Sequence, residues 1–130
     1  EEVLAMVDSF DLREQVIISS FSLESVTLFK QLAPDIDVGF LYQKWLPSVV
    51  GRVLKSGLDA IHPFYANQLW PWMTCQAHRQ GLKVRVWTVN HVPVIKNALW
   101  RQVDTIMTDD PELILAIRDH DQLKTRLQRG

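Results

Sequence analysis

Apolar strand-like runs alternate with amphipathic segments along the whole chain, and this alternation constrains the fold more than any other feature. The runs start near positions 16, 37, 58, 83 and 103, which gives a repeating unit of roughly 20 to 25 residues. The first run, 16–21, is short, β-branched and almost continuously apolar, as is typical of a strand buried on both faces of a parallel sheet. The sequence therefore predicts repeated β-α units around a parallel sheet.

Helix signals separate the predicted strands. The expected strands are 16–21, 37–42, 58–64, 82–89 and 103–107, and the expected helices are 23–33, 44–55, 68–80, 94–100 and 112–118. Ser22 and Asp110 supply side-chain oxygens at helix starts, and Gly57 and Gly81 are placed to stop helices. Residues 1–12 are expected to hold the helix of a preceding unit.

Two architectures accommodate such units: an open doubly wound sheet, or part of an eight-stranded (β/α) barrel. Five strands cannot close a barrel. No linker, charge block or low-complexity stretch divides the chain, so we expect 1–130 to be a single domain. Because the chain opens with Glu1-Glu2-Val3-Leu4 rather than with an initiator methionine, we also expect it to be a fragment of a longer protein.

The composition argues against several classes of protein. Hydrophobic residues make up 47% of the chain, too many for intrinsic disorder, and the formal net charge of -1 argues against nucleic-acid binding. No apolar run approaches the roughly 18 residues that a membrane span requires. Cys75 is the only cysteine, so the chain has no internal disulfide, and we expect this thiol to be buried on a helix.

Both architectures bind ligands at the carboxyl ends of the strands, so the residues that close each run form the candidate site. These residues are Ser20, Phe21, Leu41, Tyr42, His62, Pro63, Trp87, Thr88, Asn90, Thr108 and Asp109. Trp87 suits an apolar wall for a ligand, or equally a filler between strand and helix. His62 suits an acid, a base or a phosphate contact, although a hydrogen-bonded histidine without a catalytic role is the favoured interpretation. Asp109 and Asn90 are more simply capping and turn residues.

Familiar motifs of nucleotide and hydrolase sites are missing. The chain has neither a P-loop nor a G-x-G-x-x-G fingerprint, and Ser20 lacks the G-x-S-x-G context of a nucleophile. His78, His91 and His120 form no H-x-x-x-H or H-E-x-x-H pair, so each is expected to be solvated.

The order of short motifs nevertheless resembles one family. Ile-Ser-Ser-Phe at 18–21, Ile-His-Pro at 61–63, Trp-Thr-Val-Asn at 87–90 and Thr-Asp-Asp-Pro at 108–111 resemble the C-terminal half of bacterial glycerophosphodiester phosphodiesterases. The last two motifs, about 20 residues apart, are the most specific of the set. Gln102 is a departure, because the family usually has glycine there.

This resemblance implies a TIM-barrel type α/β fold of which the chain forms the last five β/α units. It also implies a hydrolase of lipid and glycerol metabolism that converts glycerophosphodiesters to glycerol 3-phosphate and an alcohol with a divalent metal, Mg or Ca. In the family, the catalytic histidines and metal carboxylates belong to His-Arg-Gly, His-Asp, Glu-x-Asp and Glu-x-Lys motifs of the N-terminal half. The resembling stretch, 16–111, contains none of these motifs, so we expect no catalytic residue and no metal ligand in this chain.

By the same resemblance, Trp87 lines the wall against the glycerol, and Ser20, Phe21, His62 and Asn90 are further substrate-binding candidates. The open edges of a half-barrel predict self-association or pairing with the missing N-terminal half. The expected location is cytoplasmic, although relatives also occur in the periplasm or attached to membranes. Two alternatives remain: a non-enzymatic α/β binding or interaction module, and a phospholipase-type barrel phosphodiesterase.

Overall fold

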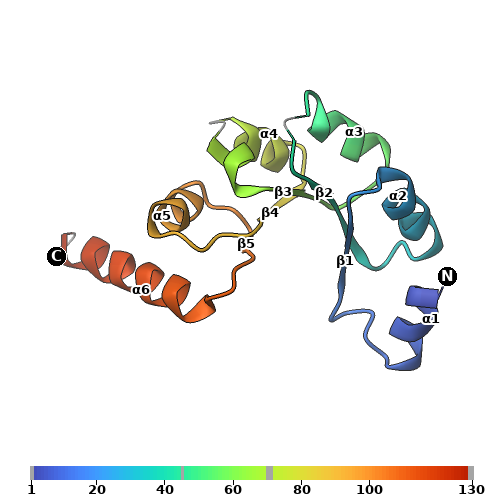
Figure 1. Cartoon of the computed structure of the whole chain (residues 1–130), viewed down its shortest axis with the longest axis horizontal. Coiled ribbons are helices and arrows are strands. Elements are labelled where there is room, and N and C mark those ends of the chain that lie inside the picture. The colour runs from blue at the N-terminus through green and yellow to red at the C-terminus, as the bar shows by residue number, and fades with distance from the viewer. Residues whose placement is uncertain (1, 45, 70–71, 129–130) are drawn as a thin grey trace.

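The computed structural model describes the backbone of residues 2–44, 46–69 and 72–128, and the side chains of 2–44, 46–67 and 72–120. Strands and helices alternate along the chain (Figure 1). The elements are α1 (Glu2–Ser9), β1 (Ile17–Ser20), α2 (Leu23–Leu32), β2 (Asp37–Tyr42), α3 (Val49–Lys55), β3 (Ala60–Pro63), the 3-10 helix η1 (Tyr65–Leu69), α4 (Met73–Arg79), β4 (Lys83–Val86), α5 (Val92–Trp100), β5 (Thr105–Ile106) and α6 (Pro111–Gln128). The predicted succession of β-α units is confirmed.

The order of the strands distinguishes between the two predicted architectures. The described strands form one sheet in the order β1-β2-β3-β4-β5, and every neighbouring pair is parallel. A doubly wound sheet reverses its strand order at a switch point, whereas a (β/α) barrel adds each strand beside the previous one. The sequential order therefore excludes the open doubly wound alternative.

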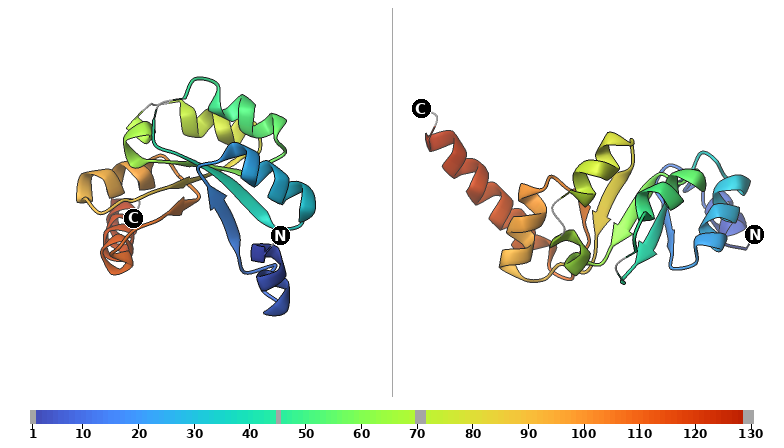
Figure 2. Two further views of the ribbon diagram at one scale, coloured as in Figure 1. Left: turned by 45° about the vertical axis from the view of Figure 1, so that its right-hand side comes forward. Right: turned by 90° about the horizontal axis from the view of Figure 1, so that it is seen from above.

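The sheet is curved, and its two faces differ. Figure 1 shows α2, α3, α4 and α5 on the outer, convex side of the arc, and Figure 2 shows the same arrangement from two other directions, with α1 and α6 at its two ends. Successive strand side chains point to opposite faces. In β2, Val38, Phe40 and Tyr42 are buried in the core beneath the helices, so the intervening residues of that strand face the concave side.

The side-chain caps predicted at Ser22 and Asp110 are confirmed. The Ser22 Oγ accepts a hydrogen bond from the Ser25 N–H at 3.1 Å, and the Asp110 Oδ1 accepts one from the Leu113 N–H at 3.0 Å. Each bond satisfies an amide in the first turn that has no partner within its own helix.

Four of the described helices end in the same conformation. The residues that follow α1, α3, α4 and α5 include Asp11, Gly57, Gly81 and Gln102, with φ values of 54°, 68°, 78° and 56°. The Gln102 N–H donates to the Leu99 carbonyl at 3.1 Å, as the two glycine N–H groups do in their own helices. Gln102 thus occupies a left-handed position, which costs a residue with a Cβ roughly 1 kcal/mol.

Replacing Gln102 with glycine is expected to raise the free energy of unfolding by about 1 kcal/mol, because the side-chain clash of the left-handed conformation is removed. Urea denaturation would measure the change. Gln80→Gly is the matched control, since Gln80 ends α4 at a φ of -97° and gains nothing from glycine. Equal responses of the two variants would contradict the prediction.

Some predicted boundaries and one burial were wrong. The helix expected at 44–55 begins only at Val49, because Pro47 precedes Ser48, whose φ is 61°. The helix expected at 68–80 is divided into η1 and α4, and β5 is limited to Thr105–Ile106. Cys75 is exposed rather than buried, because it lies on the outer side of α4. Of the helices in the described chain, none is both long and apolar enough for a membrane crossing.

Candidate functional site

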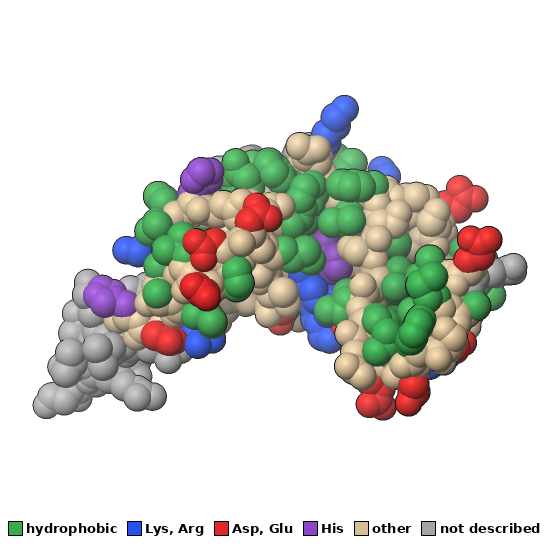
Figure 3. Space-filling view, turned by 60° about the horizontal axis from the view of Figure 1, so that its bottom comes forward, with side chains coloured by type: hydrophobic (Ala, Val, Ile, Leu, Met, Phe, Trp, Pro, Cys, Tyr) green, Lys and Arg blue, Asp and Glu red, His purple; other side chains and the backbone are tan. Residues whose placement is uncertain are grey.

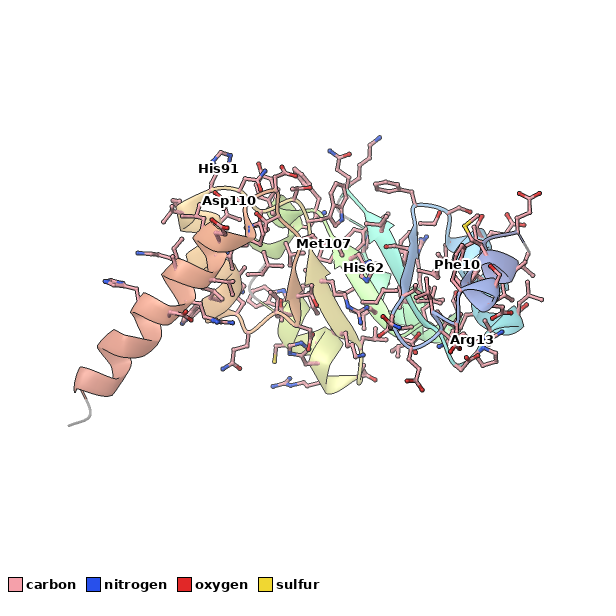
Figure 4. All side chains as sticks on the ribbon, turned by 90° about the horizontal axis from the view of Figure 1, so that it is seen from below. Phe10, Arg13, His62, His91, Met107 and Asp110 are labelled. Atoms are coloured by element: carbon pink, nitrogen blue, oxygen red, sulfur yellow. The ribbon has the colours of Figure 1, made fainter. Side chains whose placement is uncertain are left out.

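Polar and aromatic side chains gather on the concave face of the sheet. Figure 3 shows this hollowed face with basic side chains in its middle, and Figure 4 places His62 near the centre of the sheet. The parallel register sets Ser19 beside Gly39, Gly39 beside Ala60, and Ala60 beside Lys83. Four strands therefore contribute side chains to one surface.

An ion pair between the buried Arg85 and the partly buried Asp37 lies on this surface, at the amino end of β2. Arg85, 3% exposed, binds Asp37 through two hydrogen bonds, Nη1 to Oδ1 at 2.9 Å and Nη2 to Oδ2 at 2.6 Å. The Lys83 Nζ donates to the same carboxylate at 2.8 Å. Burial alone raises the pKa of Asp37, but the hydrogen bonds from Arg85 and Lys83 outweigh it and lower the pKa to about 2. The pair joins β2 to β4 across β3.

His62 lies between this ion pair and β1. It is fully buried, its Nδ1 lies 2.6 Å from the Ser19 Oγ, and its Nε2 lies 3.2 Å from the Arg85 Nη1. Burial, together with the positive charge of Arg85, lowers the pKa of His62 to about 4. The imidazole is therefore uncharged at neutral pH.

Gly39 makes room for this histidine. A Cβ at position 39 would overlap the His62 ring, with Nε2, Cε1 and Cδ2 all inside van der Waals distance. Gly39 is conformationally ordinary here, so the absence of a side chain is the property that the site requires.

An aromatic wall lies above His62, towards the carboxyl ends of the strands. The Trp87 ring makes edge contacts with Phe21 and Phe64, at centroid distances of 5.6 and 5.3 Å. The Trp87 Nε1–H donates to the His62 carbonyl at 2.8 Å, which fixes the indole against β3. Phe21 is 60% exposed, and an exposed ring at this position suits contact with a further group.

A hydrogen-bonded loop lies at the ends of β4 and β5. The Asn90 Nδ2 donates to the Asp109 Oδ2 at 2.6 Å, and the Asn90 Oδ1 accepts from the Thr108 hydroxyl and the Asp109 N–H, both at 3.0 Å. This geometry matches the simpler interpretation of Asn90 and Asp109 as turn residues, and it also leaves both side chains exposed.

The predicted site residues are brought together only in part. Phe21 contacts Trp87, and Trp87 is hydrogen-bonded to the His62 carbonyl. The full burial of His62 differs from the expected ligand contact, because protein groups take both ring nitrogens. The Ser20 Oγ accepts from the Ser22 N–H at 3.1 Å and belongs to the turn. Tyr42 is oriented away from the concave face, because its hydroxyl donates to the Met73 Sδ at 2.9 Å in the core.

Three residues of the concave face were missed from the sequence: Ser19, Arg85 and Asp37. Strand alternation offered a signal, since Ser19 precedes Phe21 by two residues and Arg85 precedes Trp87 by two. His78, His91 and His120 are exposed as predicted, with His78 Nε2 at 2.8 Å from the Asp104 Oδ2.

The side chains of this face do not fit a metal ion. Within the part of the chain that the structure describes, no three His, Cys, Asp or Glu side chains come together. The nearest carboxylates are engaged otherwise, Asp37 by two cations and Asp109 by Asn90. Neither carboxylate belongs to a group of three ligating side chains among the described residues, whereas Mg and Ca ions take several oxygen ligands.

Comparison with known proteins decides the family. The model of the glycerophosphoryl diester phosphodiesterase family matches residues 1–113. The chain belongs to this family. It is similar to a glycerophosphodiester phosphodiesterase of Caldanaerobacter subterraneus, with 32% identity over 115 residues, which make up 88% of this chain and 47% of the relative. The resemblance found in the motifs is thereby confirmed.

Solved structures of glycerophosphodiester phosphodiesterases share the fold. That from Parabacteroides distasonis has a TM-score of 0.82 at 21% identity, over 92% of this chain and 50% of that chain. A phosphodiesterase from Oleispira antarctica, in complex with the product sn-glycerol-3-phosphate, has a TM-score of 0.68 at 19% identity, over 85% and 47%. The predicted TIM-barrel type is confirmed. The chain spans about half the length of the curated relatives it matches.

Proposed function

We propose that this chain is the C-terminal half of the catalytic barrel of a phosphodiesterase that hydrolyses glycerophosphodiesters to glycerol 3-phosphate and an alcohol. One observation carries the proposal: this sequential parallel arc matches about half the length of a relative that bears this name. The concave face of the arc carries aromatic and polar side chains. Within the described chain, β1 and β5 each pair with one neighbour, so each has a free edge for further strands.

In this proposal the substrate lies against the aromatic wall of Phe21, Phe64 and Trp87. The wall offers apolar contact to the glycerol carbons, and the bond from Trp87 to the His62 carbonyl keeps the indole in one orientation. Asn90 lies at the rim, where its exposed amide is held by Asp109. The roles of this half are to orient the substrate and to exclude water from one side of it.

Acid, base and metal are assigned to residues outside this chain. A divalent metal in such a site stabilises negative charge on the phosphoryl oxygens. The described residues form no site for it, and His62 is too buried to exchange protons with a substrate. The free edges of β1 and β5 also support pairing with the N-terminal half or, without it, self-association.

We propose the cytoplasm as the location of the protein.

The test is glycerol 3-phosphate release from glycerophosphocholine or glycerophosphoethanolamine, with added Mg or Ca, by this chain and by the full-length parent. We expect activity in the parent only. Trp87→Ala in the parent should lower kcat/KM roughly tenfold, through loss of an aromatic contact of about 1.5 kcal/mol. Trp100→Ala is the matched control, because Trp100 is 76% exposed at the end of α5 and should have no effect.

Activity in the isolated chain would show that the catalytic groups lie within it and would contradict the assignment. An inactive parent would contradict the function itself. Equal losses in the two tryptophan variants would contradict the aromatic wall as the substrate contact.

A further inference from the structure

We propose that the Ser19 hydroxyl donates a hydrogen bond to an oxygen of the bound ligand, beside the aromatic wall. Ser19 is the last residue in a chain of hydrogen bonds that runs from Arg85 through His62 to Ser19, called the relay below. The inference deepens the proposed function and rests on it for the nature of the ligand. It assigns a binding role to Ser19, which the sequence motifs left to its neighbour Ser20.

The relay has a direction, and Arg85 sets it. A guanidinium has only donors, so the 3.2 Å contact between the Arg85 Nη1 and the His62 Nε2 requires an unprotonated Nε2. The imidazole is neutral at physiological pH, since its pKa lies near 4, and its single proton is therefore on Nδ1. Asp37 holds the guanidinium in place through two hydrogen bonds.

The protonated Nδ1 of His62 faces Ser19. At a distance of 2.6 Å, the His62 Nδ1–H donates and the Ser19 Oγ accepts. The hydroxyl proton of Ser19 is then free to point elsewhere, and among the described residues no other hydrogen bond engages this oxygen. A hydroxyl that already accepts a bond from a polarised donor is itself a stronger donor.

The position of Ser19 directs this proton towards the ligand. Ser19 is exposed on the concave face, two residues before Phe21 on the same side of β1, and Phe21 contacts Trp87. Its neighbour Ser20 points to the other side, where its oxygen accepts from the Ser22 N–H. The two adjacent serines therefore have different roles.

The chemistry of the contact follows from the direction of the relay. The Ser19 hydroxyl at the end of the relay is a donor, and the positive charge of Arg85 lies at the other end. This hydroxyl therefore suits an acceptor oxygen and, best, an anionic phosphoryl oxygen. The same proton placement rules out a nucleophilic Ser19, because an imidazole that donates to a serine cannot also remove its proton. The relay binds and does not attack.

The experiment compares Ser19→Ala with Ser20→Ala in the full-length protein. The binding of sn-glycerol 3-phosphate is measured by calorimetry, and kcat and KM are measured with glycerophosphocholine. Ser19→Ala is expected to weaken the binding of glycerol 3-phosphate about ten- to a hundredfold, as for a hydrogen bond to a charged acceptor, and Ser20→Ala less than about threefold. Ser19→Thr keeps the hydroxyl and should recover most of the affinity.

A second readout tests the relay without any ligand. Long-range proton–nitrogen NMR of the histidines should show His62 as a neutral ring with its proton on Nδ1. A proton on Nε2 would overturn the relay, and so would equal affinities of the two alanine variants.

Different results would contradict the Ser19 contact and the proposed phosphodiesterase reaction. If the wild-type protein releases no glycerol 3-phosphate yet binds it in a manner that depends on Ser19, the contact stands and the reaction does not. If the wild-type protein hydrolyses the substrate and Ser19→Ala changes neither binding nor KM, the reaction stands and the contact is overturned. Absence of binding to the wild-type protein would also overturn the contact.

Discussion

Replacing Arg85 with methionine is expected to lower the free energy of unfolding by about 3 kcal/mol, the lower end of the range found when one partner of a buried ion pair is removed, because Asp37 is only partly buried and keeps Lys83. Arg85 is 3% exposed and makes two hydrogen bonds to Asp37 and one to His62. Without it, a partly buried carboxylate keeps only Lys83, and the His62 Nε2 loses its donor. Urea denaturation at pH 7.5 would measure the loss.

Arg13→Met is the matched control. Arg13 also binds carboxylates, Asp35 through Nη1 at 2.8 and 2.9 Å and Asp8 through Nε and Nη2, but these pairs lie on the surface. Solvent screens exposed pairs, so the midpoint of denaturation should hardly move. A second variant, Arg85→Met with Asp37→Leu, should recover much of the stability because no carboxylate is then left unpaired. Equal effects of Arg85→Met and Arg13→Met would contradict the structural importance of the pair of Arg85 and Asp37.

Acidification from pH 7 to pH 4 is expected to lower the free energy of unfolding by about 3 kcal/mol through His62 alone. The folded protein holds the pKa of His62 at about 4, whereas the unfolded chain has the ordinary value of 6.5. At pH values between these two pKa values, His62 is protonated in the unfolded state and unprotonated in the folded state. Stability is therefore fully present above pH 6.5 and falls as the pH drops towards 4.

Denaturation curves at pH 7.5, 6, 5 and 4.5 would show this slope. His62→Gln should flatten it, whatever its effect on stability at pH 7.5, whereas His91→Gln should leave it unchanged because His91 is exposed. Asp37 acts at lower pH, since its pKa of about 2 lies below the ordinary 3.8 and its contribution is lost only as the pH falls from about 4 to 2. A flat profile in the unaltered protein would contradict the buried, neutral His62.

The succession of elements could be predicted because its causes are local. The apolar runs, the oxygens of Ser22 and Asp110, and the glycines at 57 and 81 act through neighbours within a few residues. Local signals were weaker where the backbone depends on distant packing. The loop before α3, with Ser48 at a φ of 61°, and the short β5 are the clearest cases.

The candidate site was only partly predictable. Phe21 and Trp87 follow strands that are far apart in sequence, and the rule that parallel strands share one carboxyl edge was enough to bring them together. The choice between Ser19 and Ser20 depends on the phase of β1 in the sheet, which a short apolar strand does not reveal. The sequence showed that side chains alternate between the two faces of the sheet over residues 83–87. It did not show that the face of Arg85 is the concave one.

The sequence by itself determined the repeating β-α units, the helix caps and the family, because each rests on residue type and spacing along the chain. Only the tertiary structure decided that the strands curve in sequential order and that Asp37, His62 and Arg85 form one network from three strands. The physical reason is that burial and charge pairing depend on neighbours 20 or more residues away. The protonation of His62 follows from those neighbours, and so does the direction in which Ser19 donates.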